Sequence, residues 1–169
     1  MKPIIAVIGG ETDVSEESLD MAEEIGSDIA RNDCILVCGG RGGIMEAACR
    51  GAKAAGGLTV GILPSLDKRE ANKFVDIPLS TGLGYARNSL VVSCADAVIA
   101  LEGRVGTLSE IGMSLCNNRP VVVVKGSGGV SDFLESGRDK LEFGERIHVA
   151  TLGTAVDKVL DTIKKLDRQ

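Results

Sequence analysis

Aromatic side chains are almost missing from this chain, which contains three Phe, one Tyr and no Trp in 169 residues. Proteins that bind single-stranded nucleic acid stack bases on such side chains, so the sequence disfavours this class. An excess of positive charge is also missing, because the formal net charge is −5. Nucleic-acid phosphates are bound by clustered Lys and Arg, so we expect no nucleic-acid partner.

Long apolar runs are missing as well. No run approaches the roughly 20 residues that span a bilayer, so we expect no membrane segment. The apolar run at positions 3–8 stops at Gly9-Gly10 and is followed by acidic residues, which favours a buried strand over a signal sequence. We therefore expect a cytoplasmic protein. Its length predicts one domain, residues 1–169, with a self-sufficient core.

The cysteines do not form the patterns of metal or disulfide proteins. There are five, with no C-x-x-C pair. Cys34 and Cys38 share a predicted strand and would lie roughly 13 Å apart, too far for a disulfide. We expect the cysteines in the core, as small buried hydrophobes. The single histidine, His148, has no Cys or carboxylate cluster near it in sequence, so we expect no metal site.

The chain does contain an alternation of short apolar runs and helix-sized segments. The predicted strands are 3–8, 34–38, 58–63, 97–101, 121–124 and 147–149, and the predicted helices are 15–31, 43–55, 84–94, 107–117 and 154–167. The strand runs are apolar throughout, as in buried parallel strands. This alternation predicts an α/β fold, a Rossmann-like doubly wound parallel sheet with helices on both faces.

Two glycine-rich turns each follow a predicted strand. The first is Gly39-Gly40-Arg41-Gly42-Gly43, and the second contains Gly103, Gly106 and Thr107. Glycine lets the backbone approach a ligand closely, and the first N–H groups of the next helix point unpaired toward an anion. Two such turns in a chain of this size predict a nucleotide-like ligand that carries a phosphate.

Two familiar phosphate-binding fingerprints are not completed. Met45 stands where the G-x-G-x-x-G pattern of dinucleotide-binding proteins requires its last glycine. The Gly-Lys-Ser/Thr string of a P-loop does not occur in the sequence. The sequence therefore disfavours a standard dinucleotide-dependent dehydrogenase and a P-loop NTPase.

Thr107 and Glu110 allow two interpretations. Their Thr-x-x-Glu spacing is that of a capping box, in which both side chains cap backbone N–H groups at the start of a helix. Their position after a buried strand, beside Gly103 and Gly106, favours a Glu that also serves chemistry on the ligand.

Arg87 is the second candidate for chemistry on the ligand. A cation near the start of a helix is slightly disfavoured by the helix dipole, so a bound anion explains Arg87 better than a surface position. Its planar fork of donors suits phosphate or carboxylate. Arg41 is expected to play a similar part, whereas Arg104 is interpreted as a solvated turn residue.

Several ordered motifs resemble one superfamily. They are Cys38-Gly-Gly-Arg-Gly-Gly-Ile-Met-Glu46, Gly84-Tyr-Ala-Arg-Asn88 and Gly106-Thr-Leu-Ser-Glu110, all between Ile4 and Val124. The superfamily holds the LONELY GUY (LOG) cytokinin-activating phosphoribohydrolases and the molybdenum-cofactor carrier proteins. The segment 81–88 is similar to the carrier-like branch.

The resemblance implies a protein that binds a phosphorylated nucleotide or nucleotide-like cofactor at the carboxyl edge of its sheet. The implied ligand is the molybdenum cofactor or a nucleoside monophosphate, with no further cofactor required. The alternative is a phosphoribohydrolase that cleaves the N-glycosidic bond of a nucleoside 5′-monophosphate. In that branch Gly103, Gly106 and Thr107 would bind the 5′-phosphate, and Arg87 and Glu110 would serve bond cleavage. Lysine decarboxylation, a former label of the superfamily, is not expected, because the chain lacks the setting of a pyridoxal enzyme.

The chain also departs from the hydrolase motif. Leu101 and Glu102 replace its Pro-Gly, and Ser109 replaces the first of its two glutamates. Glu102 would bring a negative charge near the phosphate pocket, which is unfavourable unless the side chain points away.

The resemblance further implies a homodimer or a higher homo-oligomer, because relatives are usually dimers or larger. Seven apolar positions near Arg87 and Glu110 suit a helix-to-helix dimer face, and packing onto the sheet explains them equally well. They are Leu83, Leu90, Val91, Val92, Ile111, Met113 and Leu115.

Overall fold

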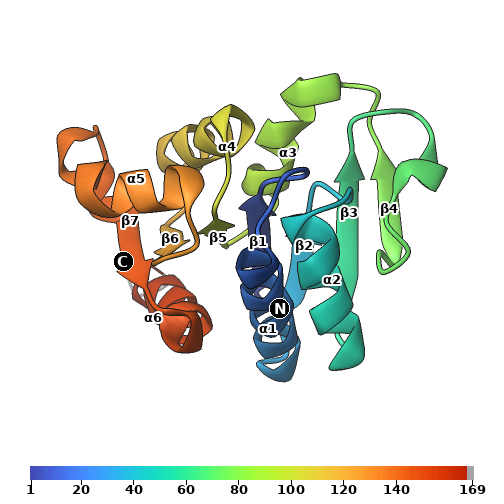
Figure 1. Ribbon diagram of the computed structural model, residues 1–169, viewed down its shortest axis with the longest axis horizontal. Helices are drawn as coiled ribbons and strands as arrows, with labels where there is room; N and C mark the ends of the chain where they lie inside the picture. The colour runs from blue at the N-terminus through green and yellow to red at the C-terminus, as the bar shows by residue number, and fades with distance from the viewer. Residues whose placement is uncertain (167–169) are drawn as a thin grey trace.

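Seven parallel strands form one sheet in the computed structural model, which describes residues 1–166 (Figure 1). The strands are β1 Ile4–Gly9, β2 Ile35–Cys38, β3 Thr59–Leu63, β4 Ile77–Ser80, β5 Ala97–Leu101, β6 Val121–Val124 and β7 Ile147–Ala150. Their order across the sheet is β4-β3-β2-β1-β5-β6-β7. The direction of winding therefore reverses between β1 and β5, where open α/β sheets place their ligands.

Helices cover both faces of this sheet (Figure 1). They are α1 Glu16–Arg31, α2 Ile44–Ala54, α3 Asn88–Ser93, α4 Val105–Cys116, α5 Gly129–Gly137 and α6 Ala155–Leu166. Side chains of a strand alternate between faces, so Ile5 and Val7 of β1 pack with α1, α2 and α6, whereas Ala6 and Ile8 pack with α3, α4 and α5. The predicted doubly wound α/β fold is confirmed.

The start of α1 illustrates how the local sequence determines an element. Ser15 is its N-cap, and the hydroxyl oxygen accepts a hydrogen bond from the N–H of Ser18 at 3.1 Å. Glu16 and Glu17 occupy the first turn, where negative charge suits the helix dipole. The polar start therefore orients the helix so that Ala22, Ile25 and Ile29 face the sheet.

One strand and one α-helix of the structure were not predicted. The strand β4 lies at the edge of the sheet, contains Pro78, and leaves Ile77 and Leu79 partly exposed, so it lacks the continuous apolar run of a buried strand. The helix α5 starts and ends with glycine, which weakens a helical pattern.

The helices predicted at 15–31 and 43–55 match α1 and α2 to within one residue at each end, and the other three predicted helices also have different bounds. The segment 84–94 divides into a 3-10 turn, η2 (Gly84–Arg87), and α3. The helix predicted at 107–117 begins two residues earlier, at Val105. The helix predicted at 154–167 is α6, and its last predicted residue, Asp167, lies outside the described residues.

Two of the cysteines expected in the core are at the surface, and several positions of the candidate dimer face are in the core. Cys34, Cys38 and Cys49 are buried as expected, but Cys94 and Cys116 are exposed. Within the candidate dimer face, Val91, Val92, Ile111 and Leu115 are buried in the protomer's own core, whereas Leu83 and Leu90 are exposed. Four of the seven positions therefore pack onto the sheet and cannot form an outer face.

Residues 1–166 contain neither a candidate membrane span nor a metal-ligand cluster. No helix there is long and apolar enough to cross a membrane. No three His, Cys, Asp or Glu side chains in this part of the chain gather in a way that could hold a metal ion.

Candidate functional site

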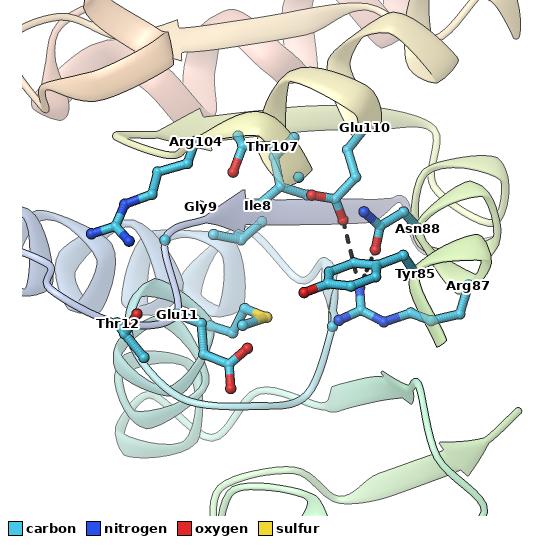
Figure 2. A pocket seen from close by; sticks show the side chains of 15 residues that line it. Ile8, Gly9, Glu11, Thr12, Tyr85, Arg87, Asn88, Arg104, Thr107 and Glu110 are labelled. Atoms are coloured by element: carbon cyan, nitrogen blue, oxygen red, sulfur yellow. Dashed lines mark hydrogen bonds and ion pairs between the residues drawn. The ribbon is translucent and has the colours of Figure 1, made fainter. Parts of the chain in front are cut away.

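A cleft of about 250 Å³ lies where β1 and β5 end. Its size is slightly below the common range for small-molecule sites, roughly 300–1,000 Å³. Five segments contribute to its wall (Figure 2). They are the end of β1 with the loop after it (residues 7–12), the residue after β2 (Gly39), the start of α2 (Met45), the η2–α3 segment (Tyr85, Arg87, Asn88) and the start of α4 (Arg104, Gly106, Thr107, Glu110).

Arg87 is buried at one end of this cleft, with only 10% of its side chain exposed. Its Nη1 donates a hydrogen bond to Oδ1 of Asn88 at 2.9 Å, and its buried Nε has no partner among residues 1–166. Burial lowers the pKa of Arg87, and the charge of Glu110 opposes this shift. The sequence predicted an anion-binding Arg87, and the structure puts its guanidinium, partly unpaired, in the cleft.

Gly39 allows the guanidinium to reach this position. A Cβ atom at residue 39 would lie 2.5 Å from Nη2 of Arg87 and 2.7 Å from Sδ of Met45. Real Cβ atoms do not come so close to other groups, so any larger residue would displace the arginine or the methionine. The first glycine turn therefore shapes the site by admitting a side chain from another segment.

Glu110 points from α4 toward Arg87 (Figure 2). Its side chain is 8% exposed, and its Oε1 lies 3.7 Å from Nη1 of Arg87. Burial raises the pKa of Glu110 to about 7, although the Arg87 charge lowers it. A carboxyl group with this pKa is present in both protonation states near neutral pH, which suits general acid or base chemistry.

The start of α4 is open toward the cleft. No side chain caps it at Arg104, and its first backbone hydrogen bond runs from Leu108 N–H to Arg104 O at 2.9 Å. The amides of residues 105–107 therefore keep no intrahelical partner, and they form a typical anion site. Thr107 lies in this first turn, lines the cleft and is 3% exposed.

The capping box proposed for Thr107 and Glu110 is absent. Gly103, at φ +91°, turns the chain directly after β5, so α4 starts at Val105 and Thr107 is already inside the helix. Glu110 then lies in the second turn and contacts Arg87 rather than the backbone at the helix start. The alternative interpretation, a Glu available to a ligand, is the one compatible with this geometry.

The first glycine turn contributes less to the cleft than predicted. Gly39 lines it, whereas Gly40, Arg41 and Gly42 are not among its lining residues. Nε of Arg41 pairs with Oε1 of Glu11 at 2.9 Å, and both side chains are about 40% exposed. Arg41 is thus an ion-paired residue near the rim.

Arg104 and Glu102 also differ from expectation. Arg104, interpreted as a solvated turn residue, lines the cleft and pairs with Asp13 at 3.0 Å. Glu102 does not itself line the cleft, although its Oε2 lies 3.8 Å from the Cβ position of Gly10, which does. Its backbone has φ +51°, its Oε2 is buried without a hydrogen-bond partner within residues 1–166, and burial raises its pKa.

Several residues that line the cleft were not predicted from the sequence. Asn88 holds Arg87, Tyr85 stands at the rim, and residues 9–12 form one wall. One sequence signal could have identified the wall, because Gly9-Gly10 also follows a buried strand. Asn88 had no such signal, since its role depends on which residue its amide meets in space.

Comparison with known sequences identifies relatives over most of the chain. The model of the SLOG cluster4 family matches residues 2–155. An uncharacterized protein of Archaeoglobus fulgidus is 44% identical over 122 residues, which cover 72% of this chain and 79% of that protein. A Mycobacterium tuberculosis protein named cytokinin riboside 5′-monophosphate phosphoribohydrolase is 34% identical, over 71% of this chain and 69% of its own length.

Solved structures resemble the fold over nearly its full length. The molybdenum cofactor binding protein of Rippkaea orientalis has a TM-score of 0.86 and 35% identity, covering 96% of this chain and 98% of that one. The molybdenum cofactor carrier protein of Chlamydomonas reinhardtii has a TM-score of 0.84 and 33% identity, covering 98% and 99%. The resemblance expected from the motifs is thereby confirmed.

Proposed function

Because the chain belongs to the SLOG cluster4 family, we propose that it binds a phosphorylated nucleotide or nucleotide-like cofactor in the cleft between the ends of β1 and β5. The observation that carries this proposal is the open start of α4, with the buried Thr107 beside unpaired amides. A phosphate there would accept hydrogen bonds from these amides and gain from the helix dipole.

The molybdenum cofactor is one candidate ligand, since similar structures are those of proteins that bind or carry it. Its phosphate suits the donors at the start of α4, and the unpaired Nε of Arg87 offers a further donor to an anionic or carbonyl group. In a carrier the chain would bind, orient and shield the cofactor, and the cofactor's chemistry would belong to a later enzyme.

The phosphate requirement can be tested by calorimetric titration with adenosine 5′-monophosphate and with adenosine. We expect binding of the monophosphate and much weaker binding of the nucleoside. Thr107→Val should weaken monophosphate binding by about tenfold, about 1.4 kcal/mol, by removing one donor. Thr154→Val, a matched change in the exposed turn before α6, should have no effect. Equal affinity for nucleoside and monophosphate would refute the phosphate site.

The alternative function is hydrolysis of the N-glycosidic bond of a nucleoside 5′-monophosphate. The observation that favours it is the buried pair of Arg87 and Glu110, with the pKa of Glu110 at about 7. In this reaction a water oxygen bonds to C1′ of the ribose, and the C–N bond breaks with its electrons passing to the base. Glu110 would accept the proton of the water, while Arg87 would orient the ligand.

Incubation with several nucleoside monophosphates distinguishes the two functions, with free base and ribose 5-phosphate measured by chromatography. A hydrolase releases both in equal amounts, and Arg87→Ala and Glu110→Gln abolish the release. Glu46→Gln, in the first turn of α2 and outside the cleft, serves as the control and should keep the activity. Binding without release would leave the carrier function. A mass spectrum of the ligand that co-purifies would then identify it.

The oligomeric state is a separate proposal, a homodimer or higher homo-oligomer. Exposed apolar side chains lie on η2, on α3 and at the start of α4, where a second copy could cover them. These residues are Leu83, Tyr85, Leu90, Val105 and Leu108. Light scattering tests the proposal, because a monomer at micromolar concentration contradicts it.

A further inference from the structure

Arg87 has two oxygen neighbours at its Nη1, and the nearer one is uncharged. Oδ1 of Asn88 accepts a hydrogen bond from it at 2.9 Å, whereas Oε1 of Glu110 lies at 3.7 Å. The first distance is that of an ordinary N–H···O hydrogen bond, and the second is too long for one. The buried cation is therefore hydrogen-bonded to a neutral amide, while its ion pair with the Glu110 carboxyl is too long for a hydrogen bond.

Asn88 is held in one orientation by contacts on both sides. It is 6% exposed and is the first residue of α3. Its Nδ2 faces Oγ of Ser109 at 3.4 Å, and that hydroxyl donates to the carbonyl of Gly106 at 2.6 Å. Because the amide nitrogen is directed toward α4, the amide oxygen must face the guanidinium.

We propose that Asn88 is a positioning residue, which keeps Nη1 of Arg87 in a hydrogen bond and so prevents the loose ion pair with Glu110 from tightening into a hydrogen-bonded, bidentate one. This inference rests on the proposed function, in which Glu110 acts on the ligand. A carboxyl group bound in a bidentate fork by arginine would have its oxygens occupied. With Asn88 in place, the Glu110 carboxyl stays free on the side of the cleft.

The other charged or titratable groups near Arg87 do not take over this role. Cys38 approaches from β2, and Glu11 and Arg41 approach from the loops after β1 and β2. Cys38 is held by Cys49, 3.5 Å away between the two Sγ atoms, and by the N–H of Gly40 at 3.3 Å. Glu11 and Arg41 are bonded to each other. Glu110 is thus the acceptor that Arg87 would meet if Asn88 released it.

The test is the titration of the Glu110 carboxyl carbon by NMR, compared with Glu110→Gln for assignment. Asn88→Leu keeps the branching and the number of non-hydrogen atoms of the side chain and removes the acceptor. The guanidinium should then move to Glu110, and the pKa of Glu110 should fall by about 1–3 units relative to the parent chain. Asn117→Leu is the matched control, because Nδ2 of Asn117 also joins α4 to α3, at Ser93 Oγ (3.0 Å). It should leave the Glu110 titration unchanged.

A second variant keeps the proposal testable if Asn88→Leu fails to fold. Asn88→Asp retains the acceptor and adds a charge, so Arg87 stays bound and the pKa of Glu110 should not fall. A fall in Asn88→Asp would overturn the proposal, as would an unchanged pKa in folded Asn88→Leu or an equal fall in Asn117→Leu. The titration needs neither ligand nor turnover, so its outcome is independent of whether the proposed function holds.

Discussion

The β2–α2 turn and the β5–α4 turn both follow a buried strand and both open a helix, but different groups stand at the two helix starts. At α2, the N–H of Ile44 donates to Gly10 O at 2.9 Å, and the Glu11 carbonyl lies against Gly43. At α4, no side chain caps the start, and Thr107 faces the cleft. Protein carbonyls thus occupy the place at α2 that an anion could occupy at α4.

A helix start that follows glycines is therefore not by itself an anion site. At α2 the glycines let the β1–α1 loop pack against the helix and admit the Arg87 side chain beside Gly39. At α4, Gly106 leaves space beside the helix start, whereas Gly103 is packed against Thr107. The first turn is therefore expected to matter mainly for stability, and the second mainly for binding.

Gly43→Ala should give the largest effect on stability. Gly43 has φ +61° and ψ −132°, which side chains avoid, and its Cβ would meet Gly10 O and would lie 2.6 Å from Glu11 O. We expect a loss of about 2–4 kcal/mol in the free energy of unfolding, measured by denaturant titration. Gly56→Ala is the control, because Gly56 has φ +78° with nothing within 4 Å. It should cost only about 1–2 kcal/mol. Equal losses would mean that the loop carbonyls play no part.

The second expected effect is a pH dependence that comes from Glu110. Its pKa of about 7 lies above the ordinary value of 4.5, so the folded chain binds more protons than the unfolded chain between these values. The free energy of unfolding should therefore fall as pH rises from about 4.5 to about 7, by up to roughly 1.4 kcal/mol per unit.

Glu110→Gln should remove this part of the slope, as measured by denaturant titrations across the same pH range. Glu102 has a raised pKa and adds a slope of the same sign. Burial lowers the pKa of His148 below 6.5, which adds an opposite slope. The difference between the two chains isolates the contribution of Glu110. If the free energy of unfolding of parent and variant has the same dependence on pH, the raised pKa of Glu110 is contradicted.

The fold was predictable wherever burial leaves a continuous apolar pattern. β1, β5 and β6 are covered on both faces, so their runs of Val, Ile, Ala and Leu identify them without further information. β4 has only one neighbouring strand, and Pro78 interrupts it. β4 forms by pairing with β3, and a local sequence pattern does not show which strand lies beside it.

The sequence identified residues of the candidate site better than it identified the contacts between them. Arg87 and Glu110 were identified from separate motifs, and the structure brings them together, while their roles stay a prediction. The capping box was wrong, because the helix start depends on the turn at Gly103. The role of Asn88 and the direction of the Glu102 side chain could not be inferred, since side-chain direction is decided by contacts between segments distant in the sequence.

Gly106→Ala tests the second turn with a smaller effect. Its Cβ would meet only Asn88 Nδ2, at 4.0 Å, so the fold should gain up to about 1 kcal/mol from helix propensity. The added methyl group would occupy space beside the amides, so affinity for adenosine monophosphate should fall by about tenfold. Gly112→Ala, in the same helix with nothing within 4 Å, should give the gain in stability without the loss of affinity. Unchanged binding in Gly106→Ala would place the phosphate elsewhere.

Glu102→Gly should give the smallest effect and would make the two turns more alike. In the first turn the residues with positive φ are the glycines Gly40 and Gly43, whereas the second turn has Glu102 at +51°. Glycine removes that strain and the unpaired buried Oε2, at the cost of extra freedom in the unfolded chain, so a net gain of about 0.5–1 kcal/mol is expected in denaturant titrations.

Glu102→Gln separates the two contributions, because it removes the charge and keeps the side chain at positive φ. If strain dominates, Glu102→Gly is more stable than Glu102→Gln, and if the buried carboxylate dominates, the two variants are alike. A loss of stability in Glu102→Gly would mean that the Glu102 side chain supports the loop at Gly128, whose Cβ position lies 3.7 Å from its Cγ. The β5–α4 turn would then contribute to the stability of the fold, as the β2–α2 turn is expected to do.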